Sequence, residues 1–105
     1  MKRWLTLFAV STLGASLATP AAASLALAQK NACMACHASD KKLVGPAYQE
    51  VAKKYAGQKD AEANLAKSIK AGGSGKWGPV PMPAQANLSD ADAKTLAAWI
   101  LGGAK

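Results

Sequence analysis

Cys33, Cys36 and His37 are the side chains of this sequence whose types and spacing are best suited to chemistry. They stand in the order Cys33-Met34-Ala35-Cys36-His37, with an imidazole directly after the second thiol. At this spacing both thiols can reach the two vinyl groups of one porphyrin from a single helical turn, and the histidine then lies beneath the iron. The sequence therefore predicts covalent attachment of one haem, with His37 as an axial ligand of its iron.

Two other uses of the cysteine pair account for the sequence less well. A thioredoxin-like dithiol also places two cysteines at this spacing, but it needs a preceding strand and a longer following helix within a βαβ fold. The sequence around the cysteines indicates neither element. A zinc site needs four ligands, and the chain contains only one histidine and two cysteines. Haem attachment is therefore the preferred interpretation.

The second axial ligand of the iron is predicted by elimination to be Met82. The chain has no other histidine, and Met1 lies in a segment that we expect to be removed. Met34 stands between the two cysteines, where its side chain cannot reach the far face of the same porphyrin. Met82 lies in a long loop expected over 72–88, within the sequence PVPMP at 79–83. Because proline fixes φ and favours extended backbone, this segment can hold a thioether in place without a sheet. A methionine that fills a gap in the core is the alternative interpretation.

With two axial ligands, an iron has no open position for oxygen, peroxide or substrate. Methionine ligation also raises the reduction potential into a respiratory range. The residues therefore favour an electron carrier over an enzyme. A haem enzyme or gas sensor, with Met82 off the iron and a polar distal pocket, is one alternative. A haem subunit of a larger oxidoreductase is another.

The amino-terminal segment has the layout of a secretory signal peptide. A basic start is followed by an apolar run over 4–18, which Pro20 breaks. The alanines at 21–23 form a small-x-small cleavage pattern, so we expect a signal peptide over 1–23 and one exported domain over 24–105. A second pattern of this kind a few residues later, or an uncleaved anchor, is the alternative. The apolar run is shorter than the roughly 20 residues that a bilayer span needs.

Beyond the signal peptide, alanine- and lysine-rich stretches separated by glycine and proline predict helices and no sheet. The first helix is expected over 24–32, leading into the cysteines. The second is expected to begin at Pro46 and to stop at Gly57, with Glu50 and Lys54 paired on its outer side. Its expected inner face comprises Tyr48, Val51, Ala52 and Tyr55.

Two further helices are expected before and after the long loop. The third is expected to be capped by Asp60, to bury Leu65 and Ile69, and to end at a glycine pair. The fourth is expected to follow Ser89, where Asp92 three residues later resembles a capping box. Its apolar stripe comprises Ala93, Leu96, Ala97 and Ile100, with Trp99 beside it.

The chain resembles the small bacterial class I cytochromes c of the c-551 type, also called c8. The resemblance rests on the motif at 33–37, on VGPAY at 44–48, on WGPVPMP at 77–83, and on the closing helix with Leu96 and Trp99. It implies an all-α, single-domain class I cytochrome c fold, with about four short helices wrapped around one covalent haem c. It also implies a soluble periplasmic electron carrier that is not an enzyme and often serves a nitrite reductase or another respiratory enzyme.

The same resemblance implies further haem-site residues beyond the two cysteines and the axial ligands. The carbonyl of Pro46 would accept a hydrogen bond from the His37 ring, which fixes the orientation of the imidazole. Trp77 would donate to a haem propionate, although ordinary core packing is an alternative role for a tryptophan. Gln85 and Asn87 both compete for the place of an amide side chain near the methionine sulfur, because 84–88 is one residue longer than is usual in this family.

The charge of the exported domain predicts its class of partner. Eleven basic and six acidic residues remain beyond residue 23, a net charge of +5, and no arginine run or basic-aromatic interleaving indicates nucleic acid. We expect a monomer without a membrane span that meets an acidic redox protein through lysines near the haem motif and the ligand loop. These are Lys30, Lys41, Lys42 and Lys76, and the alternative is that they only solvate the surface.

Overall fold

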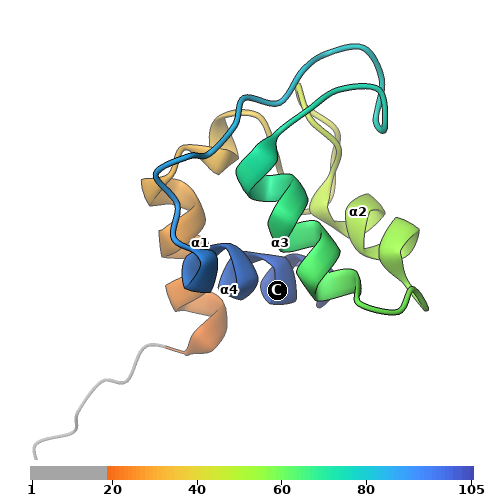
Figure 1. Cartoon of the computed structure of the whole chain (residues 1–105). Helices are drawn as coiled ribbons and strands as arrows, with labels where there is room; N and C mark the ends of the chain where they lie inside the picture. The colour runs from red at the N-terminus through yellow and green to blue at the C-terminus, as the bar shows by residue number, and fades with distance from the viewer. Residues whose placement is uncertain (1–18) are drawn as a thin grey trace, which may run out of the picture.

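The computed structural model describes residues 19–105, and these form an all-α domain (Figure 1). The elements are α1 (Pro20–Lys30), the short 3₁₀ turn η1 (Cys33–Ala35), α2 (Tyr48–Tyr55), α3 (Ala61–Ala71) and α4 (Asp90–Leu101). Two isolated bridges are the only β-type pairings in this part of the chain. None of the helices within 19–105 has the length and hydropathy of a bilayer span. The predicted class, four short helices without a sheet, is confirmed.

Helix α1 begins at Pro20, four residues before the predicted start at Ser24. The hydroxyl of Thr19 accepts a hydrogen bond from the Ala22 amide at 3.2 Å and caps the helix. Proline suits the first helical position because its fixed φ is already helical and its missing N–H would have had no helical partner. The expected cleavage position therefore falls within the first turn of α1, whereas the rest of the expected signal peptide, 1–18, lies outside the described residues.

Helix α2 begins at Tyr48, so the expectation that Pro46 opens it is wrong. Pro46 instead lies in the extended approach, where its carbonyl is free to accept a hydrogen bond from elsewhere. The expected outer pair is also wrong, because the Glu50 carboxylate lies 3.2 Å from the ammonium of Lys53. The Lys54 ammonium donates to the carbonyl of Lys76 at 3.0 Å instead. The predicted inner face is confirmed for Tyr48, Val51 and Tyr55, which are buried, and Ala52 is half-buried.

The predicted side-chain cap is present at the start of α4 but not at the start of α3. Asp60 precedes α3 as predicted, but its backbone is left-handed, with φ of 61°, and its side chain makes no capping hydrogen bond. The hydroxyl of Ser89 does cap α4, since it accepts from the Asp92 amide at 3.1 Å. Leu65 and Ile69 are buried on the inner side of α3, as expected.

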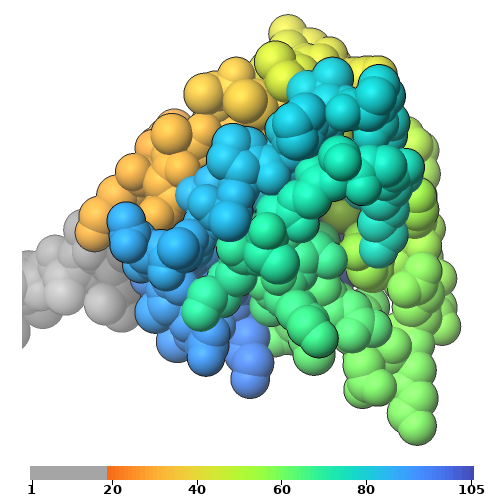
Figure 2. Space-filling view, turned by 45° about the horizontal axis from the view of Figure 1, so that its top comes forward, coloured from red at the N-terminus to blue at the C-terminus, as the bar shows by residue number. Residues whose placement is uncertain are grey.

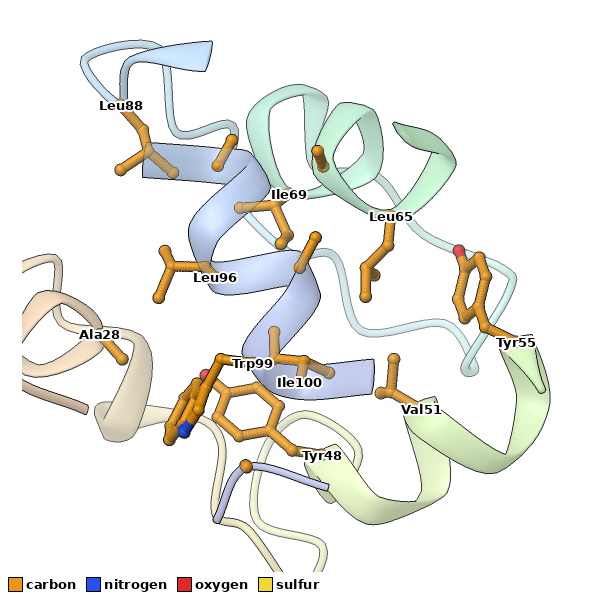
Figure 3. Packing of buried hydrophobic residues seen from close by; sticks show 14 residues of the cluster. Ala28, Tyr48, Val51, Tyr55, Leu65, Ile69, Leu88, Leu96, Trp99 and Ile100 are labelled. Atoms are coloured by element: carbon orange, nitrogen blue, oxygen red, sulfur yellow. The ribbon is translucent and has the colours of Figure 1, made fainter. Parts of the chain in front are cut away.

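Helix α4 lies at the centre of the domain and packs against α1, α2 and α3. Its stripe of buried side chains includes Leu96, which is only 2% exposed, and Ile100 (Figure 3). Tyr48 meets Trp99 edge to face, with 5.5 Å between ring centroids, and Ala28 from α1 closes this end of the core. One contiguous apolar cluster therefore joins all four helices.

The segment 72–88 joins α3 to α4 without helical structure, as predicted. It arches from the end of α3 to the start of α4 (Figure 1). Figure 2 shows it, in cyan and blue, crossing the face of the molecule that is turned toward the viewer. Gly73 and Met82 exchange two backbone hydrogen bonds of 3.0 and 2.8 Å, and the Gln85 amide donates to the Lys70 carbonyl at 2.9 Å. These bonds fix the part of the loop that carries Met82.

Candidate functional site

A cavity of about 310 Å³ opens between the helices and the loop 72–88. Cys33, Cys36 and His37 line it from the segment that follows α1, and Met82 lines it from the loop. The remaining wall is mostly apolar and includes the core side chains Leu65, Ile69, Leu96 and Ile100. Met82 therefore shares one apolar cavity with Cys33, Cys36 and His37, although it lies 45 residues after His37 in the sequence.

The turn η1 sets the direction of the two cysteines and the histidine. The carbonyl of Cys33 accepts hydrogen bonds from the amides of Cys36, at 3.2 Å, and His37, at 3.0 Å. The imidazole Nδ1 of His37 lies 2.8 Å from the carbonyl oxygen of Pro46. Because a carbonyl can only accept, this hydrogen bond places the ring proton on Nδ1 and leaves Nε2 with a lone pair for a metal. The ring of Tyr48 stacks on the imidazole at 5.0 Å between centroids, with an interplanar angle of 16°.

Gly45 has no side chain, and the imidazole of His37 occupies the space where its Cβ atom would lie. A Cβ atom on Gly45 would come within 2.5 Å of Cε1 and 2.8 Å of Nδ1 of the ring. The Gly45 amide is also tied to the carbonyl of Cys36 at 2.7 Å, so the backbone cannot easily withdraw. Gly45 was not predicted as a site residue, and only its position directly before Pro46, the expected hydrogen-bond partner of His37, indicated it.

The environment of Cys33 differs from that of a thiol-exchange site. Burial raises the pKa of the Cys33 thiol, outweighing the hydrogen bonds that lower it, whereas a nucleophilic cysteine needs a lowered pKa. The element before the cysteines is helix α1 and not a strand. Both observations disagree with a thioredoxin-like dithiol and agree with thiols that face an apolar ligand.

Trp77 lies at the rim of the cavity and not in the hydrophobic core. It lines the cavity but is 39% exposed, and the ammonium of Lys54 lies 4.4 Å above its ring. Next to it, the ammonium of Lys76 donates to the hydroxyl of Tyr55 at 2.5 Å. Burial alone would raise the pKa of Tyr55, but the hydrogen bonds from Lys76 and Ser68 and the lysine charges lower it overall. This rim therefore carries positive charge and hydrogen-bond donors.

The two candidate amides of the loop do not reach the cavity wall. Gln85 is half-buried, and its side-chain nitrogen donates back to the carbonyl of Pro83 at 3.3 Å. Asn87 is exposed. Neither residue is among those that line the cavity. The structure thus brings together Cys33, Cys36, His37 and the other expected residues, but not these two.

The arrangement fits a covalently attached haem. Two thiols and an imidazole lie at one side of an apolar cavity, and a thioether enters from another segment. The lone pair on the His37 ring and the soft sulfur of Met82 are the ligand types that haem iron accepts in electron-transfer proteins. The lysine, tryptophan and tyrosine side chains at the rim suit the polar edge that carries the propionates.

Comparisons with known proteins agree with this chemistry. The family model described as cytochrome c matches residues 21–104. Cytochrome c-552 of Nitrosomonas europaea is 53% identical over 93% of this chain and 93% of that protein. Cytochrome c-551 of Pseudomonas aeruginosa is 57% identical over 71% of each chain.

The fold also matches a solved structure. The crystal structure of wild-type Nitrosomonas europaea cytochrome c552 matches with a TM-score of 0.73 and 54% identity, covering 75% of this chain and 98% of that one. The family model, the similar sequences and the similar structure are therefore all of cytochromes c. The chain belongs to the cytochrome c family, as a small bacterial cytochrome of the c-551 and c-552 type that carries one covalently bound haem c.

Proposed function

We propose that this protein is a periplasmic electron carrier that moves single electrons between respiratory redox proteins and catalyses no reaction of its own. The observation that carries the proposal is the convergence of Cys33, Cys36, His37 and Met82 on one apolar cavity. In this proposal the two cysteines form the thioether bonds, and His37 and Met82 are the axial ligands of the iron. The relatives named cytochrome c-552 and c-551 support the carrier role.

The surrounding side chains have supporting tasks in this proposal. The hydrogen bond to the Pro46 carbonyl holds the His37 ring and leaves Nε2 available to the iron. The apolar wall excludes water, so that the surroundings of the iron need little rearrangement when its charge changes by one. Trp77 and Lys76 line the cavity and would be placed to meet the haem propionates. When bound, the haem supplies a reversible Fe³⁺/Fe²⁺ couple whose potential methionine ligation raises.

The proposal is tested on the protein exported from cells with a working haem-maturation system. We expect an intact mass equal to residues 24–105 plus one haem that survives acid-acetone extraction. A redox titration is expected to show one reversible one-electron step, with a thioether-to-iron band in the oxidised spectrum. A polypeptide mass without haem would remove the covalent site, and an oxidised spectrum without the thioether band would remove the methionine ligand.

We further propose that the carrier meets an acidic partner through the lysines beside the cavity mouth. Lys41 and Lys42 are exposed, Lys42 also lines the cavity, and neither takes part in an ion pair within residues 19–105. Exposed Val44 and Val80 lie at the same mouth, 57% and 60% exposed. Lys76 is less suited to this task, because its ammonium is bonded to Tyr55.

The bimolecular electron-transfer rate with an acidic partner is therefore expected to fall as salt rises. Complementary charges raise the association rate, and salt screens them beyond roughly 8 Å at physiological ionic strength. Reversing Lys41 and Lys42 to glutamate is expected to flatten this dependence without moving the reduction potential. Reversing Lys59 and Lys67, which are exposed and do not line the cavity, changes the net charge equally and serves as the control. A rate that is flat in salt, or equal effects of both double variants, would contradict docking at these lysines.

A further inference from the structure

We propose that Gly72 is a positioning residue for the axial thioether of Met82. The inference rests on the proposed ligation by Met82 and adds the feature of the chain that places this sulfur. Gly72 follows the last residue of α3. It lies against the extended loop segment 82–84, which carries Met82 and is called the ligand strand below. The loop therefore approaches the end of α3 more closely than any residue with a side chain at position 72 allows.

The contact at Gly72 involves backbone and not a flexible side chain. A Cβ atom at this position would clash with the carbonyl oxygen of Met82, and it would lie 2.8 Å from both the Pro83 carbonyl carbon and the Ala84 nitrogen. These three atoms belong to the strand on which Met82 is mounted. Because these are backbone atoms, no rotamer change can relieve the clash. The backbone that carries Met82 must shift instead.

The same strand is also fixed to the end of α3 and the glycine pair by backbone hydrogen bonds. Gly73 donates to the Met82 carbonyl at 3.0 Å and accepts from the Met82 amide at 2.8 Å. Three residues beyond Met82, the Gln85 amide donates to the carbonyl of Lys70 in α3 at 2.9 Å. Helix α3 is in turn anchored in the core through Leu65 and Ile69. The position of the sulfur is thus set from α3, through the backbone of the glycine pair.

Gly72 also has a positive φ of 64° with ψ of −158°, a backbone conformation that essentially only glycine adopts. The test must therefore separate the effect of backbone strain at position 72 from the effect of the contact between its Cβ atom and the ligand strand. Gly75 provides the matched control, because it lies in the same loop with φ of 95° and a Cβ atom on it would meet nothing within 4 Å. Alanine at either position introduces backbone strain, but only Gly72→Ala pushes on the ligand strand.

The experiment uses the purified holoproteins of the wild type, Gly72→Ala, Gly75→Ala and Met82→Ala. We expect Gly72→Ala to lose part or all of the thioether-to-iron band when oxidised, to bind carbon monoxide when reduced, and to have a lowered reduction potential. Gly75→Ala is expected to match the wild type in all three measurements. Met82→Ala gives the complete loss against which the effect at Gly72 is scaled.

Asparagine is found at positive φ more often than alanine and still carries a Cβ atom. Gly72→Asn, compared with Gly75→Asn, therefore repeats the test if Gly72→Ala does not fold. A folded Gly72 variant with the wild-type band and no carbon monoxide binding would overturn the inference, as would equal changes at Gly75. If Met82→Ala itself leaves the band unchanged, the proposed ligation fails, which is a separate outcome from a silent Gly72 variant.

Discussion

Replacing Met82 with alanine is expected to convert a closed, six-coordinate iron into one with an open position. Among the residues that line the cavity, Met82 is the only thioether, so its loss leaves no equivalent side chain to replace it. The reduced protein is expected to change from no detectable carbon monoxide binding to stoichiometric binding. The reduction potential is expected to fall by a substantial part of the roughly 0.8 V range over which axial ligands set haem potentials.

Optical spectra of the oxidised and reduced protein, with and without carbon monoxide, measure this change together with a redox titration. Met34→Ala is the matched control, because Met34 is half-buried beside the cysteines but does not line the cavity. Its spectrum and potential are expected to stay at the wild-type values. A Met82→Ala protein that keeps the thioether band would exclude Met82 from the iron.

Replacing both Cys33 and Cys36 with alanine is expected to abolish covalent haem attachment and, with it, the folded domain. The cavity wall is built from core side chains such as Leu65, Ile69 and Leu96. Without an occupant, one side of the core has nothing apolar to pack against. A domain this small buries only roughly 60% of the surface of its unfolded chain and has little stability in reserve.

Intact mass after acid-acetone extraction measures the first effect, and far-ultraviolet circular dichroism with limited proteolysis measures the second. We expect no haem mass, and digestion at the rate of an unfolded chain. Met82→Ala is the control, because it removes the proposed axial ligand but keeps both cysteines and is expected to retain its haem. A double variant that resists protease without haem would show that the polypeptide core is sufficient by itself.

The fold was predictable where local chemistry decides it. The Ser89 cap and the apolar stripes of α3 and α4 follow from residue types at fixed spacing, and the structure confirms them. The start of α2 was predicted wrongly because proline suits both the first turn of a helix and the extended segment before one. The first helix was expected only from Ser24, where the exported domain was expected to begin, although Pro20 already opens it. Pro20 takes the first role, while Pro46 takes the second, and only the surrounding structure decides between them.

The candidate site could be predicted in part for a similar reason. The chemistry of Cys33, Cys36, His37 and Met82 could be interpreted from the sequence, and the structure brings all four to one cavity. The hydrogen bond from His37 to the Pro46 carbonyl was expected from the family resemblance, and the structure contains it. The close approaches of glycine to His37 and to the Met82 segment could not be predicted, because they depend on how closely distant backbone segments approach. Gly45 against the imidazole of His37 is the clearest case, since nothing in its residue type distinguishes it from an ordinary turn glycine.

The loop 72–88 also determines how the native state opens. Helices α2, α3 and α4 share one buried cluster, whereas most residues of this loop are exposed, and apart from the proposed bond of Met82 to the iron only a few backbone hydrogen bonds hold it. Segments with few buried contacts open at lower free energy than the core, as separate cooperative units. Heat or denaturant will therefore release the loop before the helices unfold, giving a partly open species that retains its helix content. If Met82 binds the iron as proposed, ligand exchange at the iron would then report on this local opening and not on global stability.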